Sequence, residues 1–149
     1  MIPRIASSVA SNADRGNPLP LLVPYRGLMI GIIDWSAYGV FTIADSKEQL
    51  SDGDWTAAGM AAVNIIAAST LLTLPGSGRE DAIRLAEPEW RDMVEAMQNA
   101  SVSVALAVQG QDKPRLAATA GLLADSCNTC HERFRELPYE RSRDFARLR

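Results

Sequence analysis

The sequence has few of the residues that build most metal and nucleophile sites. Its 149 residues include two cysteines and one histidine, so a zinc site with four Cys or His ligands is excluded unless carboxylates contribute. If that histidine is used elsewhere, no second one is left for a catalytic triad. Aromatic residues make up only 6%, and the valine, threonine and tyrosine alternation typical of strands is absent. The composition therefore predicts an all-helical fold.

Length and charge narrow the class of protein further. A chain of 149 residues, 47% of them hydrophobic, is long enough for one domain with a sizeable core. The formal net charge is −3, and no basic face is apparent in the body of the chain. Nucleic acid is therefore not an expected partner.

The scarce residues all lie in one run, CNTCH, at residues 127–131. A C-x-x-C-H pattern is the attachment site of a c-type haem, in which the thiols of Cys127 and Cys130 bind the porphyrin and His131 becomes an axial iron ligand. On a helix, residues four apart lie one turn apart, so the three side chains can meet one edge and one face of a flat ring. The sequence predicts one covalently bound haem c.

Two other interpretations of the motif are a CxxC redox pair and a local disulfide. A thioredoxin-like pair belongs between a strand and the start of a helix. No strand pattern precedes Ser126, which favours haem attachment.

Proline, glycine and capping residues divide the chain into four expected helices. These cover 24–44, from Asp52 or Asp54 to 74, 88–108, and from the cap Asp112 to 137, with a loop over 76–87. Because short connections make sequential helices neighbours, the prediction is an antiparallel four-helix bundle over 22–137. Residues 1–21 are expected to form an extended arm. Residues 138–149 are expected to form a charged tail, solvated or a docking strip for an acidic partner.

Apolar spacing of three and four residues predicts the inner face of three of these helices. The expected inner residues are Met60, Val63, Ala67, Leu71 and Leu74; then Trp90, Met93, Met97, Ala100, Val104 and Ala107; and then Leu116, Ala120, Leu123, Cys127, Cys130, Phe134 and Leu137. Both haem cysteines fall on the last face, so the cofactor is expected inside the bundle.

Residues 22–137 resemble the cytochrome c-prime family, the class II c-type cytochromes. The resemblance rests on CNTCHERFR at 127–135, Leu74-Pro75, Glu87-Pro88-Glu89-x-Arg91, and Tyr25-Arg26 with Trp35 nine residues later. It implies a four-helix bundle with haem near the C-terminus. It also implies that Arg26 lies by the haem propionates and that the chain dimerises through its first two helices.

Two arginines are candidate site residues. Arg26 on the core side of an apolar helix needs an anionic partner, which a propionate supplies bidentately; alternatively it extends into solvent. Arg135, one turn beyond His131, is expected near the imidazole or as an ordinary surface residue.

The face of the iron opposite His131 decides what the haem does. At 100° per residue, Arg26, Ile30, Ile33, Ala37, Phe41 and Ala44 form one inner stripe, and Met29 falls about 60° from Arg26. Ungapped comparison with the family also puts Ile30 where low-spin relatives have a methionine ligand. The expectation is a five-coordinate iron covered by Ile30, with Met29 as the alternative sixth ligand.

The predicted function is electron transfer with redox partner proteins. The alternatives are an NO- or CO-binding, gas-sequestering haem protein and a haem subunit of a larger redox complex. An enzyme is not expected, because no acid–base residue other than His131 is expected beside the iron. Covalent haem attachment is ordinarily completed outside the bacterial cytoplasm, so a periplasmic location is expected even though Met1–Ala10 shows no signal segment.

The first helix is expected to be apolar on its outer face as well. Leu28, Ile32, Trp35, Gly39 and Ile43 form this face, which predicts a homodimer or a subunit contact; alternatively the arm covers it through Leu19, Leu21 and Leu22. A membrane span is not expected, since only about 17 residues separate Arg26 from Asp45, and Asp34 lies between them.

Overall fold

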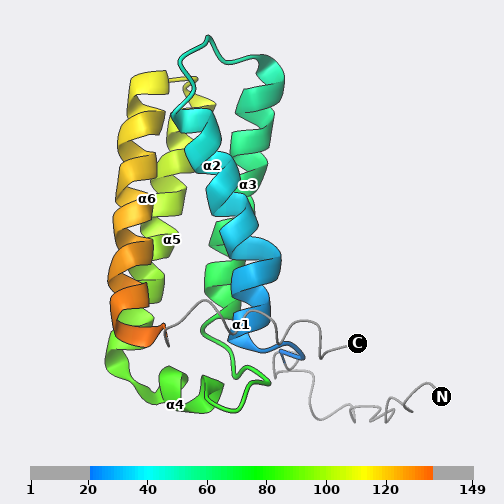
Figure 1. Cartoon of the computed structure of the whole chain (residues 1–149), viewed down its shortest axis with the longest axis vertical. Helices are drawn as coiled ribbons and strands as arrows, with labels where there is room; N and C mark the ends of the chain where they lie inside the picture. The colour runs from blue at the N-terminus through cyan, green and yellow to red at the C-terminus, as the bar shows by residue number, and fades with distance from the viewer. Residues whose placement is uncertain (1–20, 136–149) are drawn as a thin grey trace, which may run out of the picture.

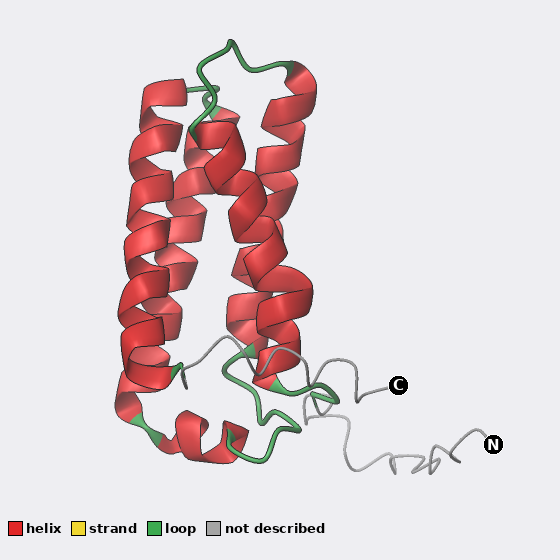
Figure 2. Cartoon of the chain, viewed as in Figure 1, coloured by secondary structure: helices red, strands yellow, loops and turns green. Residues whose placement is uncertain are grey.

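The structure, a computed structural model, describes residues 21–135. These residues form helices with no strand among them (Figure 2), so the all-helical prediction is confirmed for this part of the chain. The expected tail, all of the expected arm except residue 21, and the expected helix end at Leu137 lie outside the described residues.

The long helical stretches lie side by side, and their connections alternate between the two ends (Figure 1). The first stretch consists of α1 (Tyr25–Leu28), a π-helical turn η2 (Met29–Ile33) and α2 (Asp34–Ala44). The others are α3 (Asp52–Leu71), α5 (Pro88–Gln109) and α6 (Lys113–Phe134), and a short α4 (Asp81–Ala86) precedes α5. α3 packs against α2 and α5, while α6 packs mainly against α5 and also meets α2.

The helix starts follow local capping chemistry, with one correction. Asp112 caps α6 as predicted, because its carboxylate accepts the Arg115 backbone N–H at 2.9 Å. The cap of α3 is Ser51, not Asp52 or Asp54. Its hydroxyl accepts the Asp54 N–H at 3.2 Å, and the Asp54 carboxylate accepts the Ser51 N–H at 2.8 Å, a reciprocal capping box.

The core lies along α5 and α6 largely as predicted. Its buried residues there are Trp90, Val94, Met97, Ala100, Val104, Ala107, Leu116, Ala120 and Leu123. The predicted inner face of α3 is wrong, since Met60 is 65% exposed and Val63 is 59% exposed. α3 instead buries Trp55, Ala58, Ala62, Ile65 and Ala68. α3 carries small apolar residues on most sides, so spacing alone could not select the buried one.

The first stretch is helical over nearly the predicted range, but its inner face differs from a regular α-helix. A π-helical turn adds one residue to the helix, which shifts the residues before it by about one position, roughly 100° around the axis. Downstream of η2, Ala37 is buried as expected. Arg26, which precedes η2, and Ile30, which lies within it, are exposed instead of lying on the inner stripe.

The outer face of this stretch is only partly as predicted. Trp35 is 76% exposed, but Leu28 is buried, and Ile32, Gly39 and Ile43 are half-buried. Residues Tyr25–Ala44 form a 20-residue helical stretch that contains an 18-residue window of mean hydropathy 1.4, which length and composition alone would allow to cross a membrane. The expected absence of a span therefore stays a prediction.

Candidate functional site

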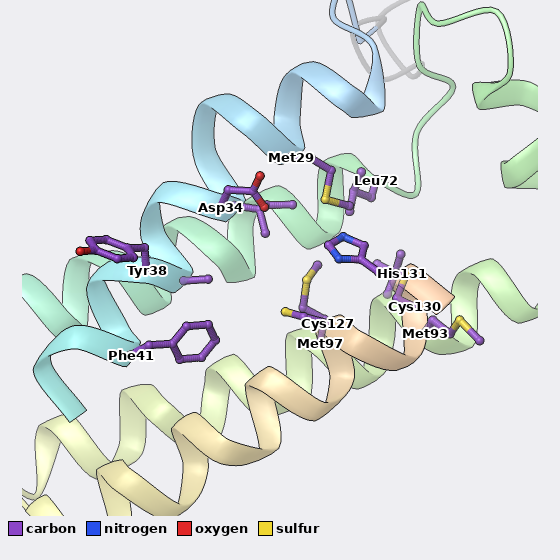
Figure 3. A pocket seen from close by; sticks show the side chains of 13 residues that line it. Met29, Asp34, Tyr38, Phe41, Leu72, Met93, Met97, Cys127, Cys130 and His131 are labelled. Carbon is purple, nitrogen blue, oxygen red and sulfur yellow. The ribbon is translucent and has the colours of Figure 1, made fainter. Parts of the chain in front are cut away.

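One apolar cavity of about 270 Å³ contains all three motif side chains. It opens between the first stretch and helices α5 and α6, where Figure 3 shows the side chains from both sides facing the space. Its lining residues are Met29, Ile33, Asp34, Ala37, Tyr38, Phe41, Leu72, Met93, Val94, Met97, Cys127, Cys130 and His131. The structure therefore brings together the CxxCH motif and Met29.

The end of α6 holds the motif against the cavity. Cys127 and Cys130 are half-buried free thiols. Burial is the main cause that raises the pKa of each, with Asp34 adding to the effect at Cys127 and Cys127 adding to it at Cys130. The pKa of each thiol is thus shifted in the direction opposite to that of a nucleophilic CxxC pair, in which it is lowered.

The pKa of His131 is lowered, which favours the neutral imidazole. Burial lowers its pKa most, the positive charge of Arg135 lowers it further, and Asp34 opposes the shift. A neutral ring is the form that ligates a metal. Arg135 thus acts on His131 from one turn further along the chain.

Met29 lies across the cavity from His131. Its side chain extends from the first stretch toward Leu72 and the imidazole (Figure 3). Ile30, expected to cover this face, is 36% exposed and does not line the cavity. The π-helical turn accounts for the exchange, because it moves Met29 to the position that a regular helix gives to Ile30.

Arg26 and Asp34 also differ from the sequence-based view. Arg26 is exposed and does not line the cavity, so its propionate role stays a prediction. Asp34 is the only carboxylate among the described lining residues, and its charge acts on both Cys127 and His131. One signal could have revealed it: Asp34 is three and seven residues before the lining residues Ala37 and Phe41, a helical spacing.

The residues present fit a haem. No group of three or more His, Cys, Asp or Glu side chains in residues 21–135 is arranged to hold a metal ion. One imidazole and one thioether can, however, complete the ligands of an iron already held by a porphyrin. The lining is apolar except near Asp34, and Asp34 and Tyr38 are exposed. A flat ring could thus enter with one edge at the surface.

The volume is consistent with such a partly open site. It is slightly below the roughly 300–1,000 Å³ common for ligand pockets, as expected if an edge of the ring remains outside. The argument rests on the chain's own residues, since comparisons with protein-family models, curated proteins and solved structures gave no match.

Proposed function

We propose that the chain is a c-type cytochrome, an antiparallel four-helix bundle that binds one haem c covalently and transfers electrons to and from redox partner proteins. The observation that carries the proposal is the meeting of Cys127, Cys130, His131 and Met29 in one apolar cavity. Bound haem supplies a one-electron iron centre. The periplasm is the proposed location.

The motif residues, Met29 and the apolar lining residues each have a role in this proposal. The thiols of Cys127 and Cys130 attach the ring, and His131 ligates the iron on one face. Met29 offers its sulfur on the other face, a ligand that raises the reduction potential of a cytochrome. The apolar residues around them exclude water from the iron.

Met29 as the sixth ligand replaces the five-coordinate iron expected from the sequence. That expectation required Ile30 over the iron, and Ile30 is exposed. The second candidate function is binding of an uncharged gas such as NO or CO, supported by the apolar lining formed by Ile33, Phe41 and Leu72. This function requires Met29 to dissociate from the iron so that the gas can bind there.

A non-enzymatic role is retained on different grounds. The sequence suggested that no acid–base group other than His131 lies at the site, but Asp34 lines the cavity. The proposal rests instead on Met29 filling the face where a substrate would bind. A dimer or subunit contact through the first stretch remains proposed, because Trp35 and Tyr38 form an exposed stacked pair with centroids 6.3 Å apart.

Expression in a haem-attaching host tests the proposal. The purified chain should gain the mass of one haem, and Cys127→Ala with Cys130→Ala should abolish the gain. A chain without added mass would refute haem attachment.

The coordination is tested on the same protein. Met29→Ala should change the visible spectrum and allow the reduced protein to bind CO, whereas Met60→Ala, on the exposed side of α3, should do neither. CO binding by the unaltered protein with no spectral effect of Met29→Ala would favour the five-coordinate, gas-binding alternative.

A further inference from the structure

The N-terminal end of the first stretch is held by a buried carboxylate from a distant part of the chain. Asp81 is 2% exposed, and its Oδ2 accepts the backbone N–H of Tyr25 at 2.9 Å and that of Gly78 at 2.8 Å. The first N–H groups of a helix have no partner within the helix, and Pro24 at the cap position supplies none. Asp81 therefore caps α1 from 56 residues away.

The Tyr25 side chain fixes the rotation of this end. Its hydroxyl donates to the Leu74 carbonyl at 2.7 Å, and its buried ring stacks on Trp90 with centroids 5.1 Å apart and planes 12° apart. These contacts join the start of α1 to the segment after α3 and to α5. The helix start cannot turn about its axis without breaking them.

The loop around Asp81 is built for close packing. A Cβ on Gly78 would lie 2.7 Å from Asp81 Oδ1, and one on Gly76 would lie 2.9 Å from the Tyr25 ring. Arg84 balances the carboxylate charge at 3.6 Å and is itself held by Glu80 at 2.8 Å. Only glycine fits at these two positions, so the loop encloses the carboxylate tightly.

The other end of the stretch is fixed independently. Ile33, Ala37 and Val40 are buried in the core, and Gly39 lies beside Ala61 of α3. A regular α-helix between the two fixed ends would need one residue fewer. The turn η2 contains the extra residue, and Met29 is the first residue of that turn.

We propose that Asp81 is a positioning residue for Met29. By holding the Tyr25 N–H, its carboxylate keeps the start of the helix in the rotation that requires the π-helical turn and directs Met29 into the cavity. Without this bond the helix relaxes toward a regular α-helix, in which Met29 turns away by about 100° and Ile30 replaces it. The inference rests on the proposed function, in which Met29 ligates the iron.

The first test compares two substitutions of Asp81 in the haem-loaded protein. Asp81→Ala should remove the sulfur-to-iron charge-transfer band of the oxidised protein and allow CO to bind, the same result that is expected for Met29→Ala. Asp81→Asn should keep the band, because an amide oxygen can accept both N–H bonds now made to Oδ2. A loaded Asp81→Ala protein that keeps the band and excludes CO would overturn the inference.

A second test removes the extra residue. Deletion of Ile30, whose side chain is exposed, should give a regular helix that keeps Met29 at the cavity and retains the band. In the Asp81→Ala protein, the deletion of Ile30 should restore the band. If Asp81→Ala acted only by destabilising the fold, a deletion would not be expected to restore it. The inference fails if the deletion alone abolishes the band or if the combination does not restore it.

The two levels of failure are distinguishable. Absence of haem mass, or a spectrum unchanged by Met29→Ala, contradicts the proposed function. If haem is attached and the band depends on Met29 but is unchanged by Asp81→Ala, only the positioning role of Asp81 is contradicted. If Asp81→Ala does not fold, the deletion of Ile30 alone still decides whether the π-helical turn places Met29.

Discussion

Trp90 of α5 is hydrogen-bonded to Leu72, which follows α3 and lines the cavity. Its replacement by phenylalanine should destabilise the protein strongly. The indole is 3% exposed, and its Nε1–H donates to the Leu72 carbonyl at 2.9 Å. Phenylalanine keeps an aromatic ring for stacking on Tyr25 but removes the donor. A carbonyl left buried without a partner costs about 1–3 kcal/mol.

The smaller ring adds a second cost. Phenylalanine leaves a void of at least methyl size beside Phe134, whose ring now meets Trp90 edge-on at 5.1 Å, and such a void costs about 1 kcal/mol. The free energy of unfolding should therefore fall by about 2–4 kcal/mol, which lowers Tm by roughly 10 °C for a domain of this size. Denaturant and thermal unfolding of the loaded protein measure both quantities.

A matched control shows whether the loss of stability is specific to the buried Trp90 or follows any replacement of tryptophan by phenylalanine. Trp35→Phe changes a ring that is 76% exposed and should alter stability by no more than about 0.5 kcal/mol. If Trp90→Phe is as mild as Trp35→Phe, the bond to Leu72 does not contribute as argued. The packing account of this end of the bundle would then be wrong.

Three further predictions address charge, pH and backbone entropy. Asp34→Asn should raise the reduction potential in a redox titration, because the negative charge of Asp34 stabilises the more positive oxidised iron and the substitution removes that charge. An unchanged or lower potential would contradict this. Burial, then the charge of Asp81, raises the pKa of Tyr25. Its contribution to stability is thus complete below the ordinary tyrosine value of 10.0 and is lost as pH rises through the folded value, so Tyr25→Phe should flatten the alkaline limb of the stability profile. Gly121→Ala should raise the free energy of unfolding by about 0.5–1 kcal/mol, since Gly121 is in the middle of α6 with nothing near a new Cβ; a loss of stability would show an unrecognised contact.

Local signals explain what could be predicted from the sequence. Pro88 and Asp112 set the starts of α5 and α6 through backbone chemistry that depends on a few neighbouring residues. The spacing of large residues along α5 and α6 also identified the faces that pack together, including the face that carries Cys127.

Long-range packing explains what could not be predicted. The prediction of a loop over 76–87 was wrong for α4, whose first residue, Asp81, caps a helix 56 residues earlier. The sequence also could not identify the buried side of α3, because most of its sides are apolar and packing against the neighbouring helices determines which side is buried. Asp34 was missed as a lining residue for a related reason, since the packing of α2 against α3 and α6 determines which of its sides faces the motif.

The choice between Met29 and Ile30 shows why the candidate ligand was the hardest feature to predict. Assigning the inner face by counting forward from Arg26 at 100° per residue assumes one unbroken α-helix. The residues that line the cavity include Ile33, Ala37 and Phe41, so the inner face has to be counted backward from them. The two counts differ by the one residue that η2 contains. No residue within Met29–Ile33 requires a π-helical turn; the requirement comes from the separately fixed ends at Tyr25 and Val40. The identity of the group facing His131 is therefore a property of tertiary packing and not of the motif or of the neighbouring residues alone.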